Sequence, residues 1–294
     1  MLLLDGAVSG PNVIAVGERG AIISSSDSGH TWTRIASPAK ATLTGISFAP
    51  PPASQIGWAV GHDALIIGTT DGGKTWANRY QGENLQDSFL DVLALDTQRA
   101  IAVGAYGLYA ATTDGGKTWT RRKLNNEDYH FNRLTVGAGT TLYLAGEHGT
   151  LLRSTDLGAK WAALKSPYEG SFYGLVSPGP RALLAHGLRG RVYRSVDDGR
   201  AWTQVTTPDP VLLAAAVKLR AGPIILGGQS RALLVSRDGG ATFAAVPEIL
   251  PGSIAKLLEL PDGNLLALGE AGATVIEAGR LAPGSAPSSV TRAP

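Results

Sequence analysis

The side chains of this sequence that could do chemistry fall into a repeated group and an irregular group. The repeated group consists of six aspartates, each two residues after a serine or threonine and two residues before a glycine. They are Asp27, Asp71, Asp114, Asp156, Asp197 and Asp238. Catalysis needs one site rather than six equivalent copies. At a turn, however, an aspartate and a nearby hydroxyl accept backbone N–H bonds, and glycine permits a positive φ. We therefore predict that the six aspartates stabilise turns, and we call these segments the Asp–Gly turns.

An aromatic residue stands five positions after each of these aspartates. The six aromatic residues are Trp32, Trp76, Trp119, Trp161, Trp202 and Phe243. The gaps between successive copies fall from 44 to 41 residues, and a repeat of this length with strand-like content is typical of propeller blades. We predict that each ring packs into the gap between two blades, where it buries a large area.

The irregular group contains three histidines, His62, His130 and His148. Histidines could form a metal site or an acid–base cluster, but no short ligand spacing connects these three. We interpret them as turn residues that form hydrogen bonds or face water. We therefore predict neither a metal ion nor another cofactor.

Three carboxylates complete the irregular group: Glu127, Asp128 and Glu169. A pair of carboxylates is what glycoside hydrolysis requires. The alternative, which we favour, is that these are solvated loop acids or contacts to a partner.

The elements that must position these residues follow from a second repeated phrase. It is an apolar strand that ends in a small residue and glycine, then two variable residues, then usually another glycine and a second apolar strand. The strand-ending glycines are Gly17, Gly61, Gly104, Gly146, Gly187, Gly228 and Gly269. Short apolar runs joined by glycine-bearing turns are typical of hairpins. A further apolar segment precedes each copy and a strand follows each Asp–Gly turn, so that each unit has four strands, A to D.

These units predict an all-β fold, a seven-bladed β-propeller of four-stranded antiparallel blades. The expected blades span residues 1–36, 42–80, 88–123, 130–165, 171–206, 211–247 and 253–281. The last blade is expected to be incomplete, because Glu277–Arg280 contains neither aspartate nor an aromatic residue. Residues 282–294 are rich in Pro, Ser and Ala and predict a flexible tail. Blade 7 is thus expected to lack a strand or to recruit the tail around Val290.

Composition narrows the function classes. The 294 residues, of which 44% are hydrophobic, suit one large core, and the net charge of +2 gives no general attraction to nucleic acid or membranes. The absence of cysteine excludes disulfides and thiolate chemistry. No apolar run is long enough to span a membrane. The first residues do not resemble a signal peptide, so we expect either a protein that is not exported or one whose export signal has been removed.

The Asp–Gly turns with their aromatic residues match the Asp-box, or BNR repeat, of sialidases and many other propellers. The longer phrases Val60–Trp76 and Val103–Trp119 more specifically resemble the photosystem II stability/assembly factor family and its bacterial relatives, and the pattern covers nearly all of residues 1–280. This resemblance implies a seven-bladed propeller without catalytic activity. It also implies an assembly or accessory role for a monomer that binds a protein partner, such as a membrane protein or a complex under assembly.

In photosynthetic members of that family, a cluster of arginines on one propeller face is implicated in partner binding. Here Arg19, Arg189 and Arg231 stand at turn positions, but no dense arginine array follows from the sequence. The insertions at 83–87, 125–132 and 167–172 are similar to those of the bacterial relatives from organisms without photosystems. Such relatives are often exported, so that the resemblance implies a periplasmic location.

Propeller geometry predicts where a binding site would lie. The B–C turns and the D–A connections, which join strand D of one blade to strand A of the next, emerge on one face, whereas the A–B and Asp–Gly turns occupy the other. Loops on a rigid scaffold are the usual place for function. The predicted partner-binding residues are Arg19, His62, Tyr106, Glu127, Asp128, His130, His148, Tyr168, Glu169 and Arg189.

Two other functions remain open for this face. A sialidase-like glycosidase would use a tyrosine nucleophile with a glutamate, for which Tyr106 and Glu147 are the candidates, but the Arg-Ile-Pro segment of sialidases is absent. A carbohydrate-binding propeller would expose aromatic rings such as Tyr106, Tyr129, Tyr168 and Tyr173. We predict that the protein is not an enzyme.

Overall fold

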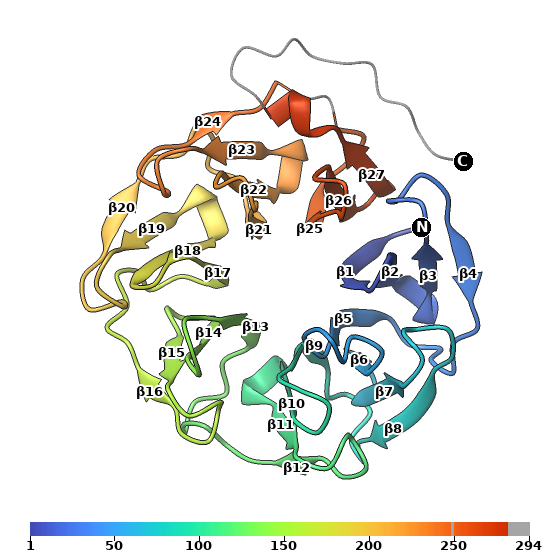
Figure 1. The fold of residues 1–294 in the computed structure, drawn as a ribbon. Coiled ribbons are helices and arrows are strands. Elements are labelled where there is room, and N and C mark those ends of the chain that lie inside the picture. The colour runs from blue at the N-terminus through green and yellow to red at the C-terminus, as the bar shows by residue number, and fades with distance from the viewer. Residues whose placement is uncertain (248–249, 282–294) are drawn as a thin grey trace. The chain divides into compact units, whose positions relative to one another are not determined.

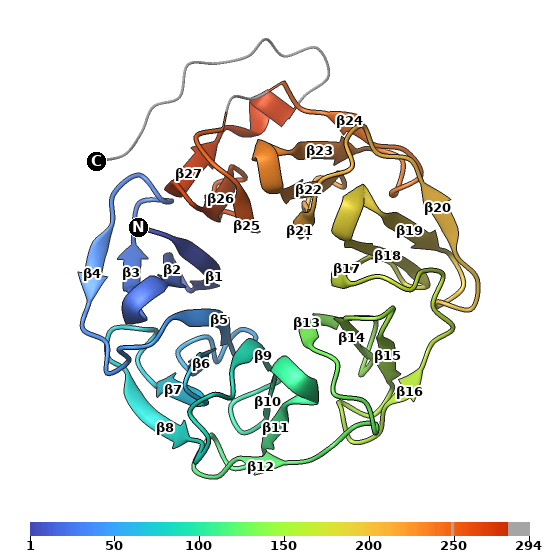
Figure 2. The ribbon, with the colours of Figure 1, turned by 180° about the vertical axis from the view of Figure 1, so that it is seen from behind.

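The computed structural model of the chain describes residues 1–247 and 250–281, and the fold is an all-β seven-bladed propeller (Figure 1). Six sheets have four antiparallel strands in sequential order and the last has three. Figure 2 shows the same ribbon from behind. The predicted fold class and the incomplete last blade are therefore confirmed. The predicted tail, including Val290, lies outside the described residues. Those that are described contain no helix with the length and hydrophobicity of a membrane span.

The first three blades lie in one compact unit, Met1–Leu134. Their strands are β1 (Leu3–Ser9), β2 (Asn12–Gly17), β3 (Ile22–Ser25), β4 (Thr33–Ile35); β5 (Leu43–Phe48), β6 (Gly57–Gly61), β7 (Leu65–Thr69), β8 (Ala77–Gln81); β9 (Phe89–Ala94), β10 (Ala100–Gly104), β11 (Tyr109–Thr112), β12 (Thr120–Arg121). Two short 3₁₀ elements, η1 (Glu18–Gly20) and η2 (Ala105–Gly107), lie in the B–C turns of blades 1 and 3.

The second unit is Thr135–Pro294, and the boundary falls inside the first strand of blade 4. The strands of blades 4 to 7 are β13 (Phe131–Val136), β14 (Leu142–Gly146), β15 (Leu151–Ser154), β16 (Ala162–Ala163); β17 (Phe172–Gly179), β18 (Ala182–Gly187), β19 (Val192–Ser195), β20 (Thr203–Val205); β21 (Leu213–Lys218), β22 (Ile224–Gly228), β23 (Leu233–Ser236), β24 (Ala244–Ala245); β25 (Ile254–Glu259), β26 (Leu265–Gly269), β27 (Gly272–Ile276). The 3₁₀ elements are η3 (Leu188–Gly190), η4 (Gln229–Arg231) and η5 (Ala278–Leu281).

The core of each unit lies between neighbouring blades. The second strands, such as β6 and β10, are buried along their whole length. Their sequences are nearly continuous apolar runs because both faces of each strand are covered. Between blades 1 and 2, for example, Ile14 of β2 packs in one cluster with Phe48 of β5 and with Trp76. The fourth strands are mostly exposed. Each blade is therefore a wedge whose edge strand faces solvent.

Candidate functional site

The B–C turns have one unusual backbone geometry in blades 1 to 6. Two consecutive residues in each turn have positive φ, for example Tyr106 at 53° and Gly107 at 70°. The N–H of Leu108 donates to the carbonyl of Ala105 across the turn at 3.0 Å. Positive φ at both central residues is the geometry of a type I′ hairpin turn, whose twist matches that of the flanking strands. The central pairs are Arg19–Gly20, Asp63–Ala64, Tyr106–Gly107, His148–Gly149, Arg189–Gly190 and Ser230–Arg231.

In blades 2 to 5 the second central residue of the B–C turn donates its N–H to a D–A connection of its own unit. The N–H of Gly107 donates to the Tyr129 carbonyl at 2.9 Å, and that of Gly149 donates to the Gly170 carbonyl at 2.8 Å. This contact explains the glycine at the second central position, because a Cβ on Gly149 would lie 2.2 Å from the Tyr168 carbonyl oxygen. In these blades the turn and the connection thus lie against each other. Their role in binding stays a prediction.

In the first unit, the predicted residues stand in blades 1 to 3 and in the connection to blade 4, and most face solvent. His62, Glu127 and Asp128 are exposed, and Tyr106 is 68% exposed. The ring of Tyr106 meets the ring of His130 edge to face, with centroids 4.8 Å apart. The sequence did not indicate this pair, since the two residues stand on different loops.

In the second unit, His148, Glu169 and Arg189 are exposed, but Tyr168 is not a free ring. It stacks on Tyr193 with centroids 5.9 Å apart and meets Phe172 edge to face. Tyr168 therefore contributes to the packing of blades 4 and 5 and offers only part of its surface to a partner.

The catalytic alternatives receive no support from the geometry within either unit. Among the described residues, no group of three His, Asp or Glu side chains is arranged to hold a metal ion. Burial and the Glu147 carboxylate raise the pKa of Tyr173, which is not the tyrosine proposed as the nucleophile.

In the Asp–Gly turns, the aspartate carboxylate is occupied by hydrogen bonds from the turn itself. In blade 3, the Thr118 hydroxyl donates to Asp114 Oδ2 at 2.6 Å and the Thr118 N–H donates to Oδ1 at 3.0 Å. The Thr112 hydroxyl donates to the same carboxylate at 2.8 Å and accepts the N–H of Gly116 at 3.0 Å. These bonds from Thr118 and then Thr112 lower the pKa of Asp114 to about 2. A carboxylate occupied in this way has little capacity left for chemistry.

The aromatic residues of these turns were predicted to pack between blades, and they do so to different extents. Trp76 and Trp119 are buried between neighbouring blades, and Trp76 Nε1 donates to the Gly73 carbonyl at 3.0 Å. Trp202 and Phe243 pack against the interblade clusters as partly buried residues.

Gly68–Thr75 also fits the spacing of a phosphate-binding loop, Gly-x-x-x-x-Gly-Lys-Thr. That loop must lie between a strand and a helix, whereas this segment joins β7 to β8. Its threonine hydroxyl, moreover, donates to Asp71 at 2.6 Å. The segment is an Asp–Gly turn rather than a nucleotide site.

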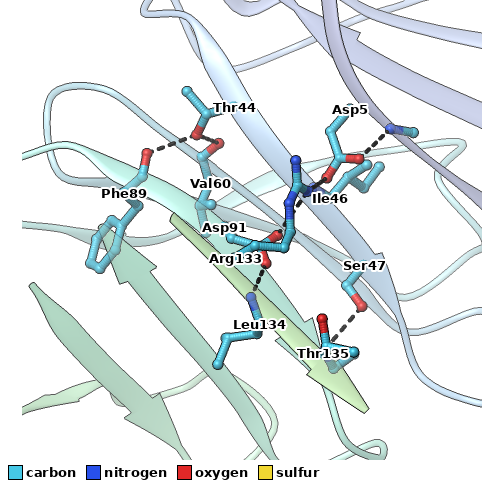
Figure 3. A network of polar contacts seen from close by, with 12 residues as sticks. Asp5, Thr44, Ile46, Ser47, Val60, Phe89, Asp91, Arg133, Leu134 and Thr135 are labelled. Atoms are coloured by element: carbon cyan, nitrogen blue, oxygen red, sulfur yellow. Dashed lines mark hydrogen bonds and ion pairs between the residues drawn. The ribbon is translucent and has the colours of Figure 1, made fainter. Parts of the chain in front are cut away.

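Sequence reasoning missed a buried ionic network in the first unit (Figure 3). Arg133 Nη1 of β13 lies 3.3 Å from Asp5 Oδ2 of β1 and 3.4 Å from Asp91 Oδ1 of β9. The carboxylates also accept backbone N–H bonds from neighbouring blades, Asp5 from Ile46 at 3.1 Å and Asp91 from Leu134 at 2.7 Å. Although burial lowers it, the charges of Asp91 and Asp5 raise the pKa of Arg133.

One signal could have revealed this network. The three residues occupy the same place, the third position of strand A, and the register of β1 and of β9 shifts there in a β-bulge. Gly45 occupies that position in blade 2, where its Cβ would lie 3.0 Å from the Cα of Asp91. Two acids, one base and one glycine at equivalent positions predict an ionic cluster.

Comparison with known proteins places the chain in a family. The family model for the photosynthesis system II assembly factor YCF48 matches residues 82–218. The photosystem II assembly lipoprotein Ycf48 of Picosynechococcus sp. is 30% identical over 298 residues, which cover 83% of this chain and 86% of the relative. The chain belongs to the YCF48 family. The predicted resemblance is thus confirmed at the level of the family.

Solved structures agree on the fold of this YCF48-family chain. A structure described as YCF48 bound to D1 peptide matches with a TM-score of 0.72 and 20% identity, covering 93% of this chain and 90% of the other. YCF48 from Cyanidioschyzon merolae has a TM-score of 0.72 at 16% identity, with 92% and 94% covered. An ancestral GH74 enzyme has a TM-score of 0.75 at 13% identity, covering 93% of this chain and 44% of the enzyme. Because an enzyme shares the fold, the fold itself does not decide between binding and catalysis.

Proposed function

We propose that this protein is a non-catalytic propeller that binds a protein partner and acts as an assembly or accessory factor. Membership of the YCF48 family carries the proposal, together with the peptide bound to a YCF48 chain of the same fold. The sequence predicts no dense arginine array, which supports a place among relatives from bacteria without photosystems. The relative described as a lipoprotein supports an exported protein.

The binding face that we propose consists of the B–C turns and the D–A connections. It is formed by segments that differ from blade to blade, whereas the Asp–Gly turns repeat the same bonded geometry. Its side chains are exposed and carry both signs of charge together with an aromatic ring, a mixture that suits a protein surface.

A capture experiment tests this proposal. The immobilised protein is exposed to an extract of its native host, beside a variant with Asp128→Ala, His130→Ala and Tyr168→Ala and a control with Leu157→Gly in an Asp–Gly turn. We expect one protein to be retained by the wild type and the control and to be lost from the triple variant. Retention by all three would refute the proposed face.

An activity assay tests the catalytic alternative separately. Turnover of sialosides or other glycosides by the purified protein, abolished by Tyr106→Phe or Glu147→Gln, would replace the binding proposal with an enzyme. We expect no turnover, because no Arg-Ile-Pro segment is present.

A further inference from the structure

In blades 1 to 6 the first central residue of the B–C turn lies in the left-handed region, which five of the six side chains there disfavour. Within the described residues, six such positions have φ between 48° and 59° and all six are exposed. A type I′ turn favours Asn, Asp or Gly there, because other side chains clash with the backbone in the left-handed region. The six residues are Arg19, Asp63, Tyr106, His148, Arg189 and Ser230. Arginine and tyrosine are unfavourable choices for this backbone.

Packing does not explain these choices. In blades 1 and 5 the second central position requires glycine, since a Cβ on Gly20 would lie 2.1 Å from the Ala39 carbonyl oxygen and one on Gly190 would lie 2.3 Å from that of Asp209. At the first position the side chains face solvent, and Tyr106 is 68% exposed. These exposed side chains therefore gain little stabilisation from burial to offset the strain of their backbone conformation.

The Asp–Gly turns provide an internal control. They also place two consecutive residues at positive φ. The first of the two is glycine in three blades (Gly72, Gly115 and Gly239) and Ser28, Leu157 or Asp198 in the other three. None of the six B–C turns uses glycine at the corresponding position. Strained residues that the fold does not need are characteristic of functional sites.

We propose that the first central residues of the B–C turns are the recognition positions of the binding face, with Tyr106 as the anchor for an extended segment of the protein partner. This inference rests on the proposed function. Within the first unit these positions present a cation, an anion and an aromatic ring, from Arg19, Asp63 and Tyr106. Such a set is complementary to a segment that carries an acidic, a basic and an apolar side chain.

Tyr106 is suited to be the anchor because its position is fixed before binding. Its ring packs edge to face on His130 at 4.8 Å, and the next residue is bonded to the Tyr129 carbonyl. A side chain that is already ordered loses little entropy on binding. Tyrosine also combines a large contact area with a polar end, and it is enriched among the residues that dominate binding energy.

The test uses peptides selected from a phage-displayed random library on the wild-type protein. The affinity of a selected synthetic peptide is then measured by calorimetry for the wild type, Tyr106→Gly, Asp63→Gly and the matched control Leu157→Gly. We expect Tyr106→Gly to weaken binding at least about tenfold, or about 1.4 kcal/mol, while its melting temperature stays equal or rises. Leu157→Gly, which relieves the same kind of strain in an Asp–Gly turn, should leave the affinity unchanged.

The outcomes separate this inference from the proposed function. Peptides that bind the wild type and both glycine variants equally, but lose affinity for the variant altered at Asp128, His130 and Tyr168, overturn the recognition role and leave the proposed face standing. A library that yields no binder overturns the inference, and the capture experiment then decides the proposed function. A lower melting temperature in Tyr106→Gly would assign Tyr106 to the framework, and Tyr106→Phe, which keeps the ring, should then restore it.

Discussion

Both the Asp–Gly turns and the B–C turns place two consecutive residues at positive φ, and they use their side chains in opposite ways. In the Asp–Gly turns the side chains bond to the turn itself, so that the same residue types recur in blade after blade. In the B–C turns of blades 2 to 5 the backbone is held by the neighbouring D–A connection, and the first side chain is exposed. The turns whose side chains bond internally thus have a regular sequence, and the turns whose side chains are exposed have a variable one.

The difference also separates stability from recognition. A substitution in an Asp–Gly turn should change the free energy of unfolding, whereas one at the first position of a B–C turn should change binding. Substitutions in the ionic network of Asp5, Asp91 and Arg133 should also change the free energy of unfolding, since its carboxylates accept bonds from the backbone of neighbouring blades. The following substitutions test this division.

The largest effect is expected from Arg133→Met. This change leaves the buried carboxylates of Asp5 and Asp91 without their cation, and an uncompensated buried charge costs about 3–5 kcal/mol. The free energy of unfolding in urea measures the loss. The matched control is Arg121→Met, which breaks the more exposed pair with Asp87 at 2.8 Å and should cost less than about 1 kcal/mol. Equal losses in the two variants would contradict the framework role of the network.

A smaller effect is expected from Asp71→Asn. Both hydroxyls that donate to Asp71, those of Thr69 and Thr75, lose part of their acceptor, so that we expect a loss of about 1–2 kcal/mol in the free energy of unfolding. Asp63→Asn makes the same chemical change in a B–C turn and should stay within about 0.5 kcal/mol of the wild type. If Asp63→Asn is as destabilising as Asp71→Asn, the two sets of turns do not differ as proposed.

Acid should remove the contribution of Asp71 selectively. Burial raises its pKa, but the bonds from Thr75 and Thr69 outweigh burial and lower it from 3.8 to about 2. Because the pKa in the folded state is depressed, the stabilisation is complete above the unfolded value and is lost as the pH falls through about 2. The difference in unfolding free energy between the wild type and Asp71→Asn should therefore shrink between about pH 4 and pH 2. A constant difference across this range would show that the ionised carboxylate is not what stabilises the turn.

Much of this molecule could be predicted because its blades repeat. The spacing of Trp76 and Trp119 and the glycines of the turns gave the strands, the blades and the missing last strand, since repeated units must bury repeated faces. The contact between Tyr106 and His130 could not be predicted, because it joins two loops that do not repeat. The positive φ of Tyr106 was hidden for the same reason, as its residue type does not indicate that conformation.

The network around Arg133 escaped prediction for a different reason. Its members are single residues in strands that otherwise repeat. Because these residues differ from blade to blade, the repeated pattern does not include them. Their equivalence appears only when the third residues of the A strands are aligned and the bulges in β1 and β9 are seen. Opposite charges at equivalent positions are therefore a useful signal in repeat proteins.

The smallest effects are expected from substitutions at the first of the two positive-φ positions in the Asp–Gly turns. Leu157 has a φ of 57° where blades 2, 3 and 6 have glycine, so Leu157→Gly relieves strain, although it frees the unfolded chain and removes a partly buried side chain. We expect a net change within about 0.5 kcal/mol. Gly115→Ala is the reverse test, since its Cβ would meet no atom closer than 3.5 Å and its φ of 75° is the only obstacle. It should cost about 1 kcal/mol in the free energy of unfolding. A cost near zero would mean that positive φ imposes little strain in these turns, and the strain argument for Tyr106 would fail with it.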